Sequence, residues 1–163
     1  MAVAITDLLH EYADGEDRTF GGDVLFVDLV PRSSWGANLH NALPRKIWRA
    51  VSSYTVGRVG AVCEACGHEG NGEAHERWRF DEEAGTQSLA RLVCLCHWCH
   101  LATHMGRAEN IGRGEEAMAH LCRVRGWSRT EAEQHVSEAF ATWRERNRRS
   151  WRVDMGALTA AAR

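Results

Sequence analysis

Long hydrophobic runs are missing from this sequence of 163 residues. No stretch approaches 18 consecutive apolar residues, so the pattern contains no candidate transmembrane helix. The first residues also lack the basic segment and following apolar segment that mark a secretory signal. We therefore expect a cytoplasmic protein that does not associate with a membrane.

A strong net charge is also missing. The formal net charge is −2, because 22 acidic residues nearly balance 20 Lys and Arg. This balance argues against a protein that binds nucleic acid through charge alone. The charge is uneven, however: residues 1–31 hold seven acidic residues and one basic one, whereas the rest of the chain holds 19 basic and 15 acidic residues. The body of the protein is therefore mildly basic, and Lys46 is its only lysine.

The length and an apolar content of 44% predict a single domain with a modest core. Composition divides the chain into a flexible acidic lead-in at 1–22, one folded domain at 23–158 and a frayed Ala-rich tail at 159–163. We expect the domain to be α+β.

Apolar patterns predict the elements of the first half. The β-branched run 24–30, which ends before Pro31, predicts a buried strand, and Pro44 begins a helix that reaches about residue 55. Segments 72–80 and 87–95 are separated by an acidic turn and predict a β-hairpin.

The second half is predicted to be mainly helical. A helix is predicted to begin within residues 96–99, and a loop follows at 105–112. Further helices are predicted at 113–124 and after Ser128, whose spacing to Glu131 fits a capping box. A short alternating segment at 151–155 is expected to pair with the strand at 24–30.

Four of the six cysteines form two C-x-x-C pairs with 29 residues between them. In a reducing compartment such pairs bind metal more often than they form disulfides, and four thiolates make a closed structural zinc site. In one alternative, His68 or His97 replaces one of the four. The remaining two, Cys94 and Cys122, lie in apolar settings and are expected to pack as small apolar residues. The predicted zinc ligands are Cys63, Cys66, Cys96 and Cys99.

These residues resemble the HNH endonucleases (His-Me finger, ββα-metal) that carry a four-cysteine zinc. The resemblance covers 63–104 and rests on the cysteine pairs, on Glu73-Ala74-His75-Glu76 and on the Cys99-His100-x-x-x-His104 segment. It implies a treble-clef zinc-finger core, extended here by the N-terminal strand and the C-terminal helices.

The resemblance also implies roles for single residues. His75, His100 and His104 match the ligands of a catalytic divalent metal, which would be Mg²⁺, Mn²⁺, Ni²⁺ or a second Zn²⁺. Glu76 stands at the position of the general-base histidine, and Arg91 stands at the position of the asparagine that orients this base. A register shifted by one residue would make His75 the base and would place Ala74 at a metal position.

We therefore expect a metal-dependent endonuclease that hydrolyses phosphodiester bonds of nucleic acid, with DNA as the expected partner. The alternative is a catalytically inactive zinc module that binds nucleic acid or a protein. An arginine-rich run with two tryptophans at 143–152 has a composition that suits phosphate contacts, although a solvated helix end has the same composition.

Overall fold

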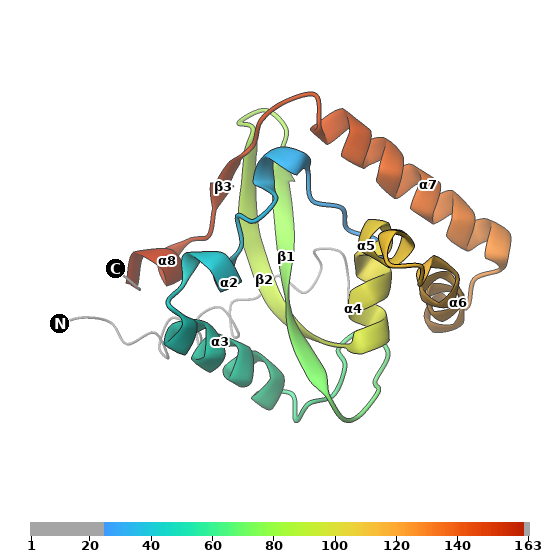
Figure 1. Ribbon diagram of the computed structural model, residues 1–163, viewed down its shortest axis with the longest axis horizontal. Helices are drawn as coiled ribbons and strands as arrows, with labels where there is room; N and C mark the ends of the chain where they lie inside the picture. Colours follow the sequence, from blue (N-terminus) through green and yellow to red (C-terminus); the bar gives the residue numbers. More distant parts are fainter. Residues whose placement is uncertain (1–24, 162–163) are drawn as a thin grey trace.

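The computed structural model describes residues 25–161 and has a mixed α+β fold. A three-stranded sheet in the order β1-β2-β3 runs through its middle. In Figure 1 the helices α2, α3 and α8 lie on one side of this sheet and the helices α4 to α7 lie on the other. Among the described helices, none combines the length and the apolar character that a membrane span requires.

The predicted hairpin is confirmed. Strand β1 (Gly72–Asp81) pairs antiparallel with β2 (Thr86–Cys96), and the register shifts once, between Arg77 and Trp78. The connecting turn is closed by the Asp81 carboxylate, which accepts a hydrogen bond from the Ala84 N–H at 2.8 Å. Because β1 lies at the edge of the sheet, residues on both of its faces can border the same surface opening.

In the described part of the chain, three helices precede the hairpin. A short 3₁₀ helix, η1 (Arg32–Ser34), and α2 (Leu39–Ala42) lead into α3 (Arg45–Gly57), for which Pro44 is the N-cap. The prediction of a helix from Pro44 to about residue 55 is therefore confirmed.

The segment after the hairpin is more helical than expected. Helix α4 (His97–Thr103) begins directly after Cys96, as predicted. The segment predicted as a loop at 105–112 instead contains α5 (Met105–Asn110). The His104 backbone stands between the two helices, with φ −94° and ψ 53°, and this conformation turns the chain.

Two longer helices follow, as predicted. Helix α6 (Gly114–Arg125) ends at Gly126, whose φ of 67° places it in the left-handed region that glycine adopts without strain. Helix α7 (Arg129–Arg146) begins with a complete capping box between Ser128 and Glu131.

The expected N-terminal strand is wrong for the residues that are described. Residues 25–30 form neither a helix nor a strand. Their backbone groups bond to helical elements instead: the Asp28 N–H donates to the Thr103 carbonyl and the Val27 N–H donates to Nε2 of His135, each at 3.0 Å. The lead-in predicted at 1–22 lies outside the described residues.

The C-terminal segment also differs from the prediction. Strand β3 (Arg152–Asp154) pairs in parallel with Thr86–Ser88 of β2, and not with residues 24–30. The chain then forms helix α8 (Ala157–Ala161), where fraying was expected from residue 159. The Leu158 side chain is fully buried and fastens this helix to the core.

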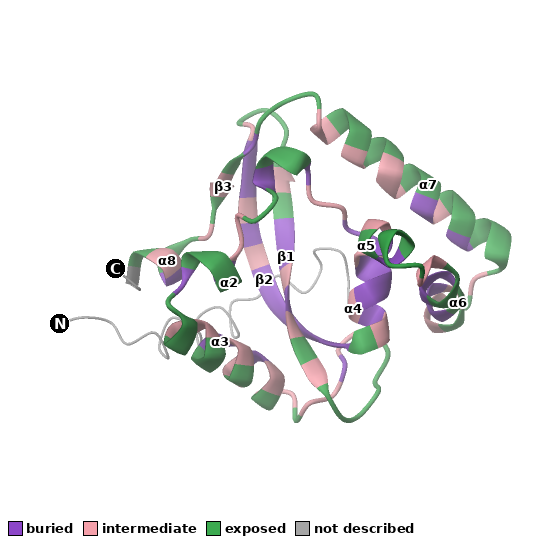
Figure 2. Ribbon diagram, viewed as in Figure 1, coloured by how far each residue is buried: buried purple, intermediate pink, exposed green. Residues whose placement is uncertain are grey.

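The hairpin separates two apolar clusters. Residues such as Val93 and Leu95 of β2 pack with α4 to α7, whereas Trp78 and Leu92 pack with α2, α3 and α8. Figure 2 shows the buried residues concentrated along β1, β2 and α4. The hairpin and α4, which carry four of the seven candidate metal ligands, are therefore held on both sides by packed helices.

Candidate functional site

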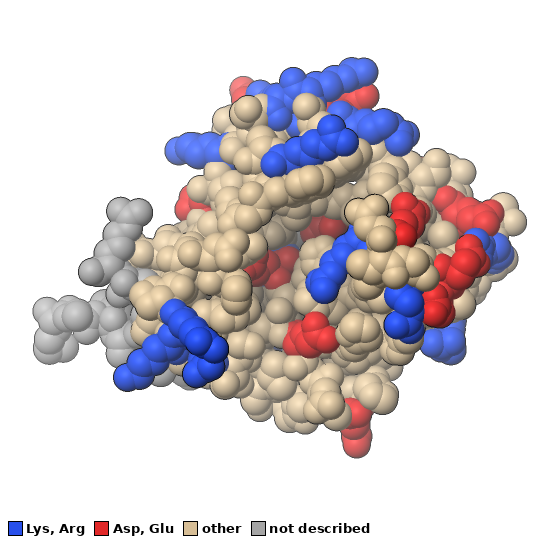
Figure 3. Space-filling view, in the orientation of Figure 1, with Lys and Arg blue, Asp and Glu red and all other residues tan. Residues whose placement is uncertain are grey.

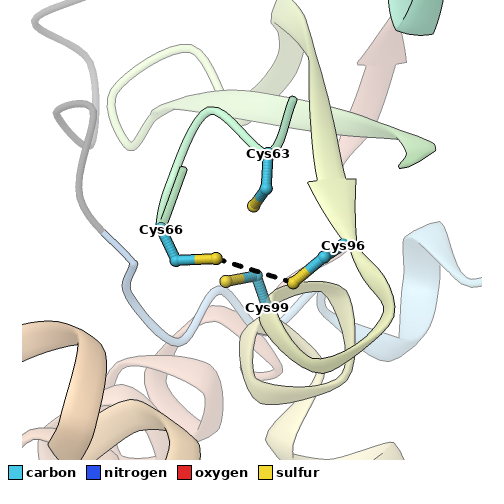
Figure 4. A group of neighbouring side chains, drawn as sticks. All are labelled: Cys63, Cys66, Cys96 and Cys99. Atoms are coloured by element: carbon cyan, nitrogen blue, oxygen red, sulfur yellow. Dashed lines mark hydrogen bonds between the residues drawn. The ribbon is translucent and has the colours of Figure 1, made fainter. Parts of the chain in front are cut away.

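The four cysteines of the two C-x-x-C pairs form one cluster. Cys63 and Cys66 come from the loop between α3 and β1, Cys96 ends β2, and Cys99 lies in the first turn of α4. Their sulfur atoms all lie within 4.8 Å of one another. Figure 4 shows the four side chains converging, with the Sγ atoms of Cys66 and Cys96 3.7 Å apart.

This geometry fits a zinc ion. Zn–S bonds of about 2.3 Å at tetrahedral angles put neighbouring sulfur atoms about 3.8 Å apart. A hydrogen bond from the Cys99 thiol and further bonds from backbone N–H groups, working against burial, lower the pKa of Cys63 to about 4, so its thiol readily becomes the thiolate that metals bind. Among the described residues, neither His68 nor His97 belongs to the cluster.

A hydrogen-bonded chain from α6 ends on one of these sulfur atoms. Arg123 lies 2.9 Å from Nδ1 of His120, and Nε2 of His120 lies 3.1 Å from Sγ of Cys99. A guanidinium group only donates, so Nδ1 accepts and the proton of the neutral imidazole stays on Nε2. Burial, together with the charge of Arg123, lowers the pKa of His120 and favours this neutral form. His120 therefore donates to the Cys99 sulfur.

Three histidines form a second cluster. His75 lies on β1, His100 lies on α4, and His104 lies at the junction of α4 and α5. Their ring centroids are 4.9 to 5.0 Å apart, and one ligand atom from each lies within 4.8 Å of the others. The structure thus brings together the three histidines that the sequence singled out.

Two of the three histidines, His75 and His104, are in the protonation state that a metal requires. Burial holds the pKa of His75 well below its ordinary value and lowers the pKa of His104 to about 3, so both imidazoles are neutral at physiological pH. The Nε2 atom of His75 is buried and makes no hydrogen bond within the described part of the chain. A metal ion is the natural partner for such an atom.

Glu73 orients one of the three rings. One of its carboxylate oxygens lies 2.6 Å from Nδ1 of His100, and the other lies 3.3 Å from Nδ1 of His97. Although partial burial acts in the opposite direction, the hydrogen bond with His100 keeps the pKa of Glu73 below its ordinary value. The bond leaves Nε2 of His100 as the ligand atom, which is the usual arrangement of a carboxylate behind a metal-binding histidine.

Glu76 lies on the opposite face of β1 from His75. Its Oε1 atom accepts a hydrogen bond from the Leu39 N–H at 2.7 Å. Burial raises the pKa of Glu76 to about 7, and the bond from Leu39 only partly opposes this shift. A carboxylate with an ordinary pKa would be a weak base at neutral pH, whereas this one can both take up and release a proton there.

Arg91 does not stand beside Glu76. It pairs with Arg77 across the hairpin, so its side chain lies on the His75 face, whereas Glu76 is opposite Leu92. Two residues that stand directly opposite each other in a β-ladder lie on the same face of the sheet. Arg91 is next to Leu92, the residue opposite Glu76, and therefore lies on the other face. The expectation that Arg91 orients Glu76 is wrong for this reason. Arg91 is instead a buried residue with 2% of its surface exposed.

A pocket of about 910 Å³ joins these groups. Its lining includes His75, Glu76, His100 and His104, although His75 and Glu76 point to opposite faces of β1. The pocket reaches both faces because β1 is the edge strand. The remaining walls come from residues 28–40, from further residues of β1, and from α3, α5 and α7.

Sequence reasoning missed two parts of the site. His120 has no spacing relation to the cysteines, and only the packing of α6 against α4 brings it to Cys99. Two tryptophans of the pocket, Trp35 and Trp143, are 108 positions apart and carry no shared motif. The arginine-rich run with two tryptophans at 143–152 was the one sequence signal for this part of the site, and it includes Trp143.

The chain was also compared with known proteins. It matches no protein-family model, no curated protein and no solved structure.

Proposed function

We propose that the protein is a metal-dependent nuclease that hydrolyses phosphodiester bonds of nucleic acid. The observation that carries this proposal is the convergence of His75, His100 and His104 within 4.8 Å at the wall of an open pocket. Three protein ligands leave a coordination position for water or substrate, unlike the closed four-cysteine cluster. The resemblance to HNH endonucleases supports the same assignment.

The ligand set narrows the choice of metal. Imidazole suits Zn²⁺ and Ni²⁺, whereas Mg²⁺ and Mn²⁺ prefer carboxylate, carbonyl and water ligands. We therefore expect activity with Zn²⁺ or Ni²⁺ before Mg²⁺. A divalent ion at this position would supply Lewis-acid chemistry, because it stabilises negative charge on the scissile phosphate and on the leaving oxygen.

Glu76 is the proposed proton acceptor. Its Oε1 atom is occupied by the Leu39 N–H, which fixes the carboxylate and leaves Oε2 for a water molecule in the pocket. The water oxygen forms a bond to phosphorus while the bond to the leaving sugar oxygen breaks. The proton of the water passes to Oε2 of Glu76, and the leaving oxygen takes a proton from solvent.

The charge distribution supports a nucleic-acid substrate. Figure 3 shows basic side chains gathered on either side of the hollowed middle of one face. One group is at the start of α3, where Arg45, Lys46 and Arg49 are exposed and no acidic residue occurs in the helix. The other is at the end of α7 with Arg144, Arg148 and Arg149, so a phosphate backbone can be held on both sides of the pocket.

A cleavage assay tests the proposal. Purified protein is incubated with plasmid DNA and single-stranded DNA in Zn²⁺, Ni²⁺, Mn²⁺ or Mg²⁺, together with His104→Ala and Glu76→Gln. We expect each substitution to reduce the rate by about 10²- to 10⁴-fold. His68→Ala, an exposed histidine outside both clusters, serves as the matched control. No cleavage with any ion, or cleavage that survives both substitutions, would refute the proposal.

The second candidate is an inactive zinc module that binds nucleic acid or a protein. It is favoured by one observation, the position of Arg91 on the face of β2 away from Glu76, which leaves the proposed base without the orienting side chain that the resemblance implies. Binding of DNA without cleavage in any of the four ions would select this alternative.

A further inference from the structure

The walls of the pocket are aromatic. Side chains from four separate parts of the chain contribute, and they surround the opening that leads to the three histidines. The aromatic residues other than histidine that line it are Trp35, Trp48, Trp78, Phe140 and Trp143. Metal binding and phosphate contact do not use such side chains, and the more exposed of them suit a ligand with a flat apolar face.

Trp35 is the most exposed of these side chains. It is 64% exposed, and Ile111 is the only other large apolar residue so exposed in the part of the chain that the structure describes. Its position is nevertheless fixed, because Nε1 donates a hydrogen bond to the Val30 carbonyl at 2.9 Å. Ile111 does not line the pocket. An exposed indole held rigidly at a pocket mouth is a ready stacking surface for a nucleic-acid base.

One histidine of the cluster is recessed. His75 is 6% exposed and its Nε2 atom is covered, whereas His100 and His104 are half-buried, so a phosphate approaches the three histidines through the pocket that they line. In a duplex the faces of each base are covered by its neighbours and the stiff backbone cannot turn into a pocket. A single strand can turn inward and can splay one base onto an aromatic side chain.

Two exposed arginines at the pocket suit a polyanionic ligand. Arg32 lies over the Trp143 ring at 5.0 Å, and Arg107 is exposed on α5. The acidic residues in the lining are Asp28, which is buried, together with Glu76 and Glu109. The two exposed arginines are therefore available to the phosphates on either side of the base.

We infer that the substrate is single-stranded nucleic acid, with one unpaired base stacked on Trp35 while the adjacent phosphate reaches the three histidines. This inference rests on the proposed function and names its substrate class. Trp35 then determines specificity for unpaired nucleotides, and Arg32 and Arg107 contact the neighbouring phosphates.

Binding measured without added divalent ion tests the inference separately from cleavage. Fluorescence anisotropy gives the affinity for a labelled single-stranded DNA and for its duplex, and an oligonucleotide with one 2-aminopurine reports stacking by loss of fluorescence. We expect tighter binding of the single strand. Trp35→Ala should weaken it by roughly 5- to 150-fold and restore the fluorescence, whereas Trp35→Phe keeps most of both. Ile111→Ala, the matched exposed apolar residue outside the pocket, should change neither.

Equal affinity for single strand and duplex, or equal effects of Trp35→Ala and Ile111→Ala, would overturn the inference. The two proposals can fail separately. Cleavage of duplex DNA without preference for the single strand refutes the substrate class and keeps the nuclease. Trp35-dependent binding of a single strand that no ion causes to be cleaved supports the stacking site and refutes the nuclease.

Discussion

The Nε2 atom of His120 lies 3.1 Å from the Sγ atom of Cys99, and both residues are buried. The bond links α6 to the cysteine cluster on α4, and Arg123 sets its direction by donating to the other ring nitrogen. A hydrogen bond to a thiolate reduces the negative charge that four sulfur atoms would concentrate on one ion, so His120 would help this cluster to hold a zinc ion.

We predict that His120→Leu lowers zinc affinity by about 10- to 100-fold, as measured by competition with a chromophoric chelator. His120→Gln can place an N–H group near the same sulfur and should recover part of the affinity. In the cobalt-substituted protein, the thiolate-to-metal absorption band should shift for the leucine variant and less for the glutamine variant. Equal losses for His120→Leu and for the exposed-site variant His68→Ala would contradict this role.

Glu73 should support metal binding by the histidine cluster, as His120 should support metal binding by the cysteine cluster. Its carboxylate bonds to Nδ1 of His100 at 2.6 Å and fixes the ring. We predict that Glu73→Gln weakens binding of Zn²⁺ or Ni²⁺ at the histidines by about 10- to 100-fold, measured by calorimetry, and leaves the zinc of the cysteine cluster in place. Glu83→Gln, at an exposed position of the hairpin turn, is the matched control and should have no effect.

A structural feature could be predicted from the sequence where residues close together in the chain determine it. The cysteine cluster built from the two C-x-x-C pairs, the hairpin and the Ser128 capping box each follow from short sequence patterns. The structure contains all three. Residues 24–30 have the composition of a buried strand. In the structure, residues 25–30 are buried or half-buried but belong to no strand. Their hydrogen bonds go to Thr103 and His135, which no local pattern indicates.

The errors at the site have the same origin. The face on which Arg91 lies depends on the pairing register of the hairpin, in which a shift of one residue moves a side chain to the other side of the sheet. His120 and Trp35 reach their partners only through packing between distant segments. The clustering of the four cysteines and of His100 with His104 was predicted because C-x-x-C spacing and i, i+4 spacing encode geometry directly.

Gly72 and Cys94 are coupled across the hairpin. A Cβ atom at Gly72 would overlap Sγ of Cys94 and would lie 3.3 Å from Cγ1 of Val56. We predict that Gly72→Ala lowers the free energy of unfolding by about 1–3 kcal/mol in urea denaturation, and that adding Cys94→Ala restores part of the loss by removing the sulfur. Gly57→Ala, where nothing lies within 4 Å, is the control. Additive effects of the two substitutions would contradict the coupling.

The capping box of α7 should give a measurable pH dependence. The Ser128 side chain and N–H group both donate to the Glu131 carboxylate, and these bonds lower its pKa. A carboxylate with a lowered folded-state pKa stabilises the fold above its unfolded pKa and loses this effect as pH falls through the folded value. We predict that Ser128→Ala costs about 0.5–2 kcal/mol at pH 7 and less in acid, measured by thermal unfolding from pH 7 to pH 3. A cost that does not change over this range would contradict the role of Glu131.

The presence of two separate metal sites is the central claim, and native mass spectrometry tests it by counting the ions on each chain. After equilibration with Zn²⁺ and removal of excess metal, we predict two ions on the wild-type protein, one held by the four cysteines and one by His75, His100 and His104. His104→Ala should retain one ion and remain folded. A single ion on both proteins would contradict the claim that the histidine cluster binds metal.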